Sequence, residues 1–142
     1  HHNAGKKKPK PLLLKIAPDL TKEQLDDIIE LSLSMNLSGL VATNTTLDRS
    51  NLSAASAQLS ESIGMGGLSG KPVQKRSTEI VHYISTQTEG KLPIIASGGI
   101  FTGEDAEEKL KAGASLVQVW TGFVYEGPSI VKNICKYLAE KK

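Results

Sequence analysis

The stretch KLPIIASGGIFTGEDAEEKLKAGASLVQVWTGF, residues 91–123, decides the fold of this chain. Its apolar run 93–96 is short and continuous, which is typical of a strand buried on both faces. Ser97-Gly98-Gly99 ends that strand. Thr102 can then serve as the N-cap of a helix over 104–112, whose first turn is acidic. The first two thirds of the stretch therefore predict a strand, a glycine turn and a helix.

The last third of the stretch predicts a second strand parallel to the first. Gly113 is a good residue to follow a helix, and the apolar run 115–120 leads into Thr121-Gly122. Two glycine turns would then lie at the carboxyl ends of neighbouring strands, where their backbone N–H groups can converge on one anion. The sequence thus predicts a phosphate site formed by Gly98-Gly99 together with Trp120-Thr121-Gly122.

The rest of the chain repeats the alternation of strand and helix, apart from a stretch over 47–68 without clear periodicity. Regular alternation predicts a parallel sheet with right-handed crossovers, and four such units are half of a (β/α)₈ barrel. We therefore predict an α/β fold in which residues 11–142 form the carboxyl-terminal half of a barrel, preceded by a basic arm or tag remnant over 1–10. The further predicted strands are 11–16 and 40–43, and the further helices are 22–35, 71–90 and 128–139.

Half a barrel leaves two open sheet edges and an uncovered apolar face, which a folded chain in water should avoid. We therefore expect a partner that closes the sheet, either the other half of a longer protein or a second copy.

Composition narrows the range of functions. A net charge of +2 over 142 residues gives no reason to expect nucleic acid as a partner. No apolar run approaches the roughly 20 residues that span a bilayer. The single cysteine, Cys135, is expected to be a buried structural thiol on the last helix. No His, Cys or Asp residues have the spacing of metal ligands, so no metal site is predicted.

Polar residues at the ends of the first two strands are the next candidates for a site. Lys15 interrupts an apolar strand, so it either faces an anionic ligand or emerges into solvent. Thr43-Asn44-Thr45 follow the second strand, and the amide of Asn44 suits the edge of a pyrimidine or imide ring, although a plain turn explains these residues equally well.

The unpatterned stretch over 47–68 is long for a compact domain, and such stretches are commonly lids or binding loops. It runs into Gly66-Gly67-Leu68-Ser69-Gly70, where the backbone can approach a flat ligand closely.

Five segments together resemble the dihydroorotate dehydrogenase family, in its membrane-associated, quinone-using class. They lie in order and at matching spacing across nearly all of residues 10–138. These segments are KIAPDL (15–20), ATNTTLDRS (42–50), GGLSGKPV (66–73), PIIASGGI (93–100) and AGASLVQVWTGF (112–123).

The resemblance implies oxidation of dihydroorotate to orotate through bound FMN, with ubiquinone as the electron acceptor. It places Asn44 and Thr45 on the substrate and Lys15 at the polar edge of the flavin ring. It further implies that the flavin is held by Lys15, Thr43, Ser69, Gly70, Gly98, Gly99, Trp120 and Thr121. Trp120 replaces a commoner tyrosine, which matters little if the contact is made through the backbone.

The resemblance also implies what this chain does not contain. The catalytic base of the family is a serine in the amino-terminal half of the barrel, and no serine here matches it. The quinone-binding region belongs to that half as well. We therefore expect no catalytic residue in this chain, inactivity of the fragment alone, and a whole protein at the mitochondrial inner membrane or, alternatively, a bacterial inner membrane.

Two alternatives remain open at this point. One is another phosphate-binding barrel enzyme, such as a dehydrogenase of reduced pyrimidines or a sugar-phosphate isomerase with Asp19 as its carboxylate. The other is a catalytically silent half-barrel that acts only in assembly.

Overall fold

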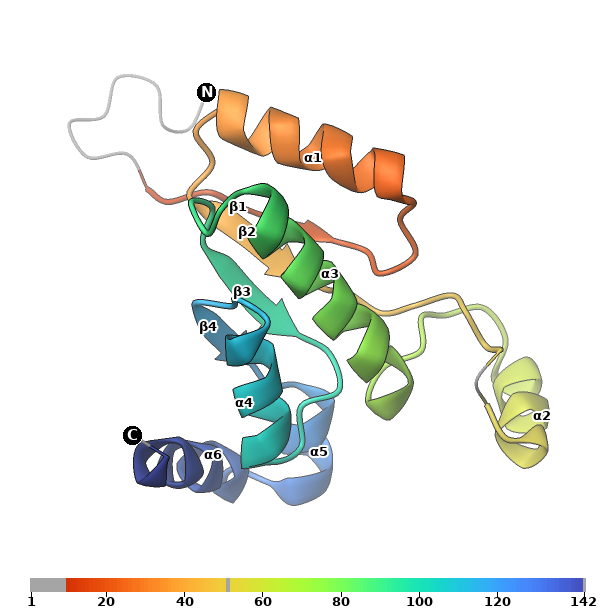
Figure 1. Ribbon diagram of the computed structural model, residues 1–142. Coiled ribbons are helices and arrows are strands. Elements are labelled where there is room, and N and C mark those ends of the chain that lie inside the picture. The colour runs from red at the N-terminus through yellow and green to blue at the C-terminus, as the bar shows by residue number, and fades with distance from the viewer. Residues whose placement is uncertain (1–9, 51, 142) are drawn as a thin grey trace.

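A computed structural model describes residues 10–50 and 52–141 (Figure 1). Most of the basic arm expected over 1–10 therefore lies outside the described residues. In chain order the elements are β1 (Leu13–Ile16), α1 (Lys22–Ser34), β2 (Gly39–Ala42), α2 (Ala54–Ile63), the 3-10 helix η1 (Lys71–Val73), α3 (Gln74–Gln87), β3 (Ile94–Ser97), α4 (Gly103–Lys111), β4 (Leu116–Gln118), α5 (Thr121–Glu126) and α6 (Ser129–Glu140).

The four strands form one parallel sheet in the order β1-β2-β3-β4, so each strand lies beside the one that follows it in sequence. This is the arrangement of half a (β/α)₈ barrel, and it confirms the predicted fold class. The strands are three or four residues long, slightly shorter than predicted at several ends.

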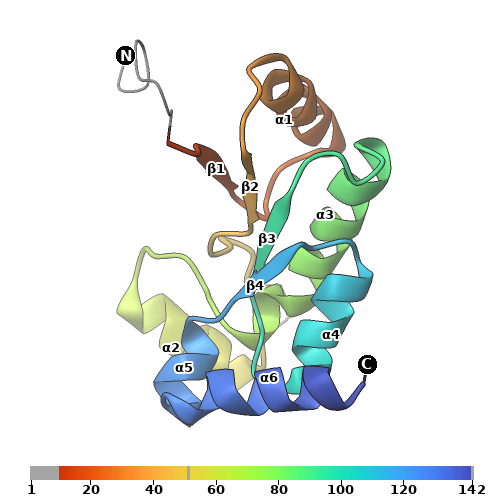
Figure 2. The same cartoon turned by 90° about the vertical axis from the view of Figure 1, so that its left-hand side faces the viewer.

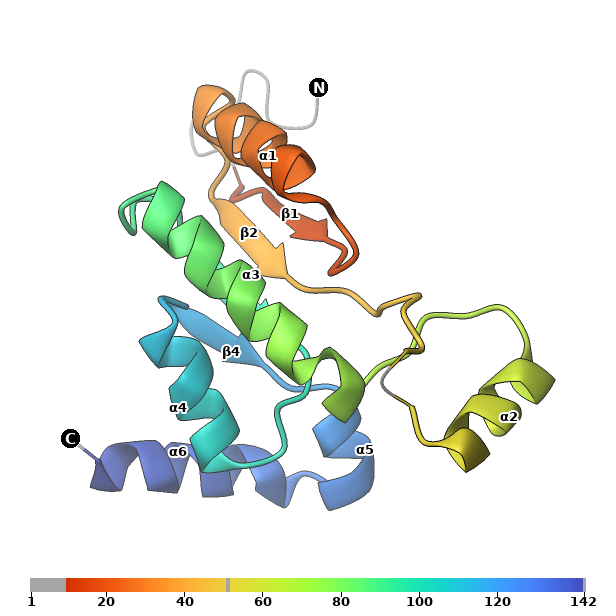
Figure 3. The same cartoon turned by 45° about the vertical axis from the view of Figure 1, so that its right-hand side comes forward.

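The two faces of the sheet differ because successive residues of a strand point to opposite sides. The paired residues Ile16, Ala42, Ala96 and Val117 face helices α1, α3 and α4, where they join the main apolar core. Figures 2 and 3 show these helices on one side of the sheet only. The neighbouring row, Lys15, Val41, Ile95 and Leu116, faces the other way, and Leu116 is 61% exposed.

Helix α4 begins and ends within one residue of the predicted range 104–112. The Thr102 hydroxyl accepts a hydrogen bond from the Asp105 N–H, while the Asp105 carboxylate accepts one from the Thr102 N–H, which completes a capping box. Gly113 follows the helix with a φ of +106°. Both ends of this helix could be predicted closely, because both depend on local chemistry.

Helix α6 corrects the prediction for the cysteine. Only Ile130 and Ile134 of this helix are buried, and they pack against Ile100 and Ala106. Cys135 is exposed, because one residue of helix turns a side chain by about 100° away from the buried Ile134. The prediction that the Cys135 thiol is buried is therefore wrong.

Two helices occur where the sequence predicted none. Helix α2 lies within the supposedly unstructured stretch 47–68, is capped by the Ser53 side chain and buries none of its residues. It projects away from the sheet and its helices (Figures 1 and 3). Helix α5 replaces the predicted turn at Thr121-Gly122. Neither helix has a buried stripe long enough to be recognised from periodicity.

Across residues 10–50 and 52–141, every helix is too short or too polar to span a lipid bilayer.

Candidate active site

One pocket of about 340 Å³ lies at the carboxyl ends of the four strands. All ten residues proposed from the sequence line it, namely Lys15, Thr43, Asn44, Thr45, Ser69, Gly70, Gly98, Gly99, Trp120 and Thr121. The pocket also includes Ser97, Ile100 and Gln118, which the sequence did not single out. The parallel sheet explains this convergence, since the carboxyl ends of all its strands meet at one edge.

Lys15 reaches the pocket from β1, on the sheet face that none of the described helices covers (Figure 2). Its paired neighbour in the sheet is Val41, and its side chain is exposed. The ammonium group therefore does not bear the cost of burial that would arise in a closed core. The structure thus places Lys15 at the pocket with its side chain exposed, and the prediction that it faces an anionic ligand stays a prediction.

The segment after β2 is fixed by a carboxylate from the loop after β1. The Thr46 hydroxyl donates a hydrogen bond to the Asp19 carboxylate, whose other oxygen accepts the N–H of Leu47 at 2.9 Å. Thr46 also pairs through two backbone hydrogen bonds with Leu68, at 3.0 and 2.7 Å. These contacts close the base of the excursion 47–67 and hold Asn44 and Thr45, directly before Thr46, at the pocket.

The Ser69-Gly70 turn contacts the segment that follows β4. The Thr121 hydroxyl donates to the Ser69 hydroxyl at 3.0 Å. A methyl group built on Gly70 would lie 3.2 Å from the Thr121 side chain, and Gly70 has a φ of +82°. Glycine thus allows the two turns to approach one another on one side of the pocket.

The Gly98-Gly99 turn lies against the start of α3. Gly99 has a φ of +72°, and a side chain there would collide with Gln74, whose Cα would lie 2.6 Å from the added Cβ. The next residues of the turn are held by Asp105, which accepts the N–H groups of Phe101 and Thr102 at 2.8 and 3.0 Å. The shape of this turn therefore depends on contacts with both α3 and α4.

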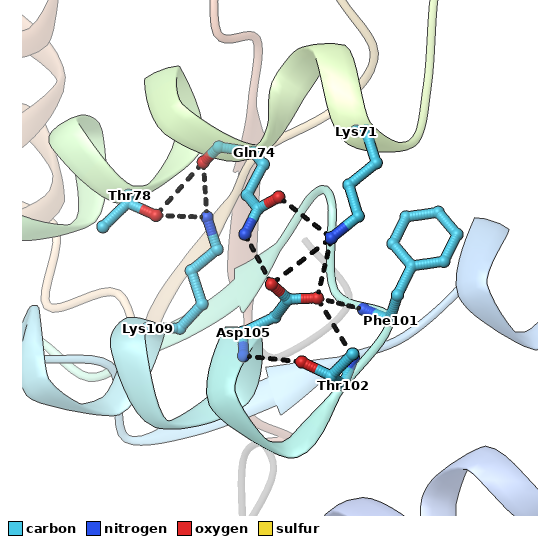
Figure 4. A network of polar contacts seen from close by, with 7 residues as sticks. All are labelled: Lys71, Gln74, Thr78, Phe101, Thr102, Asp105 and Lys109. Atoms are coloured by element: carbon cyan, nitrogen blue, oxygen red, sulfur yellow. Dashed lines mark hydrogen bonds and ion pairs between the residues drawn. The ribbon is translucent and has the colours of Figure 1, made fainter.

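Asp105 is the centre of a polar network that the sequence analysis missed (Figure 4). Besides the two backbone N–H groups, its carboxylate accepts Gln74 Nε2 at 2.6 Å and Lys71 Nζ at 3.2 Å. Burial by itself would raise the pKa of Asp105, but the Phe101 N–H, the Lys71 ammonium and the Thr102 N–H together lower it below its usual value. The carboxylate is thus held in its ionised form.

Lys109 extends this network into the interior. Its side chain is fully buried, and its Nζ donates to the carbonyl of Gln74 at 2.7 Å and to the hydroxyl of Thr78 at 2.6 Å (Figure 4). The sequence does contain a signal for this lysine, because it lies three residues after the buried Ala106 on the same face of α4. Burial lowers its pKa to about 8.

Comparison with known proteins now adds a decisive observation. The family model described as dihydroorotate dehydrogenase matches residues 2–141. This chain belongs to the dihydroorotate dehydrogenase family. A protein of Christiangramia forsetii named dihydroorotate dehydrogenase (quinone) is 54% identical over 139 residues, which are 98% of this chain and 39% of the relative. A protein of the same name from Synechococcus sp. is 53% identical over 135 residues, which are 92% of this chain and 35% of the relative.

Solved dihydroorotate dehydrogenases share the fold. The crystal structure of ligand-free DHODH from Eimeria tenella has a TM-score of 0.82 and 43% identity, with 91% of this chain and 35% of that chain covered. The complex of DHODH with ferulenol from the same organism also has a TM-score of 0.82. It is 42% identical, with 94% of this chain and 34% of that chain covered. The chain therefore spans somewhat more than a third of the length of the family members that it matches.

A second and larger hollow, of about 490 Å³, lies beside Asp19 and Arg76, apart from the pocket of about 340 Å³ at the strand ends. Two of its charged groups, Asp19 and Arg76, already have partners within the chain. Asp19 is bound by Thr46 and Leu47, whereas Arg76 donates to the carbonyls of Pro18 and Leu20 at 3.0 and 2.9 Å. We therefore assign the smaller pocket as the candidate site of this dihydroorotate dehydrogenase segment. Within residues 10–50 and 52–141, no cluster of side chains suits a metal ion.

Proposed function

We propose that the whole protein oxidises dihydroorotate to orotate with FMN as its cofactor and a quinone as electron acceptor. In this proposal the chain supplies the half of the barrel that holds the FMN phosphate and part of the substrate. Membership of the dihydroorotate dehydrogenase family supports the reaction, and relatives bearing the name with "(quinone)" support the acceptor. The single observation that carries the assignment is the convergence of all ten predicted residues on one pocket.

The residues present fit a bound phosphate. In the described part of the chain, the backbone N–H groups of Gly99, Ile100, Thr121 and Gly122 make no hydrogen bond with another group of the protein. The two segments that carry them, the Gly98-Gly99 turn and the start of α5, border the same pocket. Unpaired donors of this kind suit the oxygens of a phosphate monoester. Gly98-Gly99 and Trp120-Thr121 would therefore hold the phosphate of FMN, with Ser69 and Gly70 beside the flavin.

The remaining residues of the pocket have roles that follow from their chemistry. When FMN is bound, it supplies the hydride acceptor for the oxidation of the substrate. Lys15 places a positive charge where negative charge would develop on the flavin ring during reduction, which lowers the free energy of that step. Asn44 and Thr45 can donate and accept hydrogen bonds along one edge of a pyrimidine ring. Thr43, directly after β2, is buried and would contact the flavin.

The proposal requires a second half of the barrel. The proton of the substrate would be taken by a base from that half, since no serine of this chain corresponds to it. The same half would cover the open face of the sheet and carry the quinone site. Such an enzyme would be associated with a membrane. The choice between a mitochondrial and a bacterial inner membrane remains a prediction, and the 54% identity with a protein of Christiangramia forsetii favours the bacterial one.

The test uses the full-length protein with Lys15 changed to alanine. The unchanged protein should be yellow when purified, because it contains oxidised flavin. Adding dihydroorotate should reduce the flavin, and stopped-flow measurement of the flavin absorbance follows the rate of this reduction. We expect Lys15→Ala to slow flavin reduction by about 10²-fold, because one preorganised charge at the reacting group is lost. Lys132→Ala, at an exposed position of α6 outside the pocket, is the matched control.

Two outcomes would contradict this proposal. A colourless full-length protein that fails to take up added FMN would favour the silent assembly module. Unchanged flavin content and reduction rate in Lys15→Ala would remove the role of Lys15. The isomerase alternative has little support, since Asp19, its main candidate carboxylate, is engaged by Thr46 and Leu47.

A further inference from the structure

We propose that Lys71, Gln74 and Asp105 form a positioning group that fixes the phosphate turn, residues 98–101, relative to the Ser69-Gly70 turn. None of these three side chains lines the pocket itself. The inference rests on the proposed function, because the turn is assigned to the phosphate of FMN. It goes beyond that function by naming residues that determine how well the turn is shaped for the phosphate before FMN binds.

The first step concerns the link between Asp105 and the turn. One oxygen of its carboxylate, Oδ2, accepts both the Phe101 N–H and the Thr102 N–H. These two donors follow directly after Gly99 and Ile100, which line the pocket and whose N–H groups make no hydrogen bond with another group of the described part of the protein. Because a single carboxylate oxygen holds the end of the turn, a shift of Asp105 would shift the direction of the free donors.

The second step concerns the link between Asp105 and the Ser69-Gly70 turn. Lys71 is the next residue after Gly70, and its Nζ lies 3.2 Å from Asp105 Oδ2 and 3.4 Å from Oδ1. The same ammonium lies 5.0 Å from the centre of the Phe101 ring, where a cation is attracted to the ring face. Lys71 directly follows the Ser69-Gly70 turn and contacts both Asp105 and Phe101, the last residue of the phosphate turn. It therefore links the two turns.

The third step concerns the rigidity of the group. Gln74 donates to Asp105 Oδ1 at 2.6 Å, accepts from Lys71 at 3.3 Å and occupies the space that a side chain on Gly99 would need. The buried Lys109 also donates a hydrogen bond to the carbonyl of Gln74. Figure 4 shows these side chains pointing toward one another from η1, α3 and α4. The group is thus anchored on three elements and does not rest on one flexible side chain.

An ion pair between two exposed side chains would hold the turn only weakly, since such pairs contribute little free energy and are screened by salt. The pair here differs, because the Asp105 side chain is only 10% exposed while that of Lys71 is 57% exposed. Loss of Lys71 leaves a largely buried carboxylate with fewer partners. Because Lys71 itself is accessible, its replacement should leave the fold intact and report on the position of the turn.

The experiment measures FMN binding to the full-length apoprotein by quenching of flavin fluorescence. We expect Lys71→Met to weaken FMN on the order of tenfold, the effect of losing one charge-assisted contact. We expect Lys71→Arg to restore most of this loss, since a guanidinium can also bind the Asp105 carboxylate. Lys111→Met is the matched control: it removes the ion pair that the exposed Lys111 makes with Glu107 on α4, and it should keep the original affinity.

A spectroscopic measurement separates positioning from general stability. The ³¹P resonance of bound FMN should shift in Lys71→Met and return in Lys71→Arg. Unchanged FMN affinity in Lys71→Met, an unchanged ³¹P resonance, or a failure of Lys71→Arg to restore binding would each overturn the positioning role while leaving the proposed function intact. If the unaltered full-length protein binds no FMN, the proposed function itself fails.

Discussion

Lys109 shows how a single residue can be bound tightly and still carry a cost. Its ammonium is fully buried, and its two direct partners are neutral oxygens, the Gln74 carbonyl and the Thr78 hydroxyl. Burial lowers its pKa to about 8, and the charges of Glu108 and Asp105 offset only part of this effect. A neutral amine still has two N–H donors, so both hydrogen bonds survive loss of the proton.

This arrangement predicts how stability depends on pH. Between about pH 8 and pH 10.5, the unfolded chain keeps the proton of Lys109 while the folded protein has released it. The contribution of Lys109 to the free energy of unfolding therefore rises with pH across this window, by on the order of 3 kcal/mol. Below pH 8 both states are protonated, and the folded state carries the full cost of burying the charge.

The measurement compares Lys109→Met with the unchanged full-length protein in urea unfolding at pH 7.5 and pH 9.5. Methionine has a similar length and no charge, so the difference between the two proteins isolates Lys109 from all other titrating groups. We expect the unchanged protein to gain stability relative to Lys109→Met at the higher pH. A difference that is constant with pH would contradict this prediction, and Lys111→Met, which alters an exposed lysine of the same helix, supplies the control.

At the scale of elements, the excursion 47–67 is joined to the rest of the protein mainly through a few polar contacts at its base. Helix α2 within it buries no residue, whereas Thr46 at its base is almost fully buried. Within the excursion, Arg49 links the two ends by donating to Ser60 Oγ at 2.6 Å and to the carbonyl of Gly66 at 2.8 Å. Its position relative to the pocket therefore depends on Thr46, Asp19 and Leu68.

We predict that Thr46→Val loosens this base without unfolding the sheet. Valine has the shape of threonine but lacks the hydroxyl that donates to Asp19 and accepts the N–H of Asp48. Loss of these bonds should lower the free energy of unfolding by about 1–3 kcal/mol. It should also raise the KM for dihydroorotate, because Asn44 and Thr45 lie directly before Thr46, while FMN content stays the same.

Steady-state kinetics and flavin absorbance on the full-length protein check this prediction, with Ser62→Ala in exposed α2 as the control. A KM equal to that of the unchanged protein would show that Asp19 and Thr46 do not position the substrate segment.

At the scale of the whole molecule, the sheet is covered on one side and open on the other. β1 and β4 are both edge strands, and the uncovered row ends in Leu116. Open edges with apolar neighbours are templates for pairing with another chain.

We therefore predict that the isolated 142-residue chain associates in solution, as measured by size-exclusion chromatography with light scattering. Leu116→Lys should reduce the association, because it places a charge on an edge strand and on the uncovered face. Leu31→Lys, at a half-exposed position of α1 on the helix side, should not. A chain that stays monomeric at all concentrations would show that the sheet needs no partner.

The sequence by itself determined the features that depend on local chemistry. The strand-helix alternation, the Thr102 cap and the glycine after α4 could all be predicted, because apolar period and capping groups act within a few residues. The set of pocket residues followed partly from the polar groups and glycine turns at strand ends and partly from the resemblance to the dihydroorotate dehydrogenase family. Only the tertiary structure decided that α2 is a helix without a core, that Cys135 is exposed, and that Lys71, Gln74, Asp105 and Lys109 meet. Such contacts join residues more than 30 positions apart, and packing, which no local pattern encodes, brings them together.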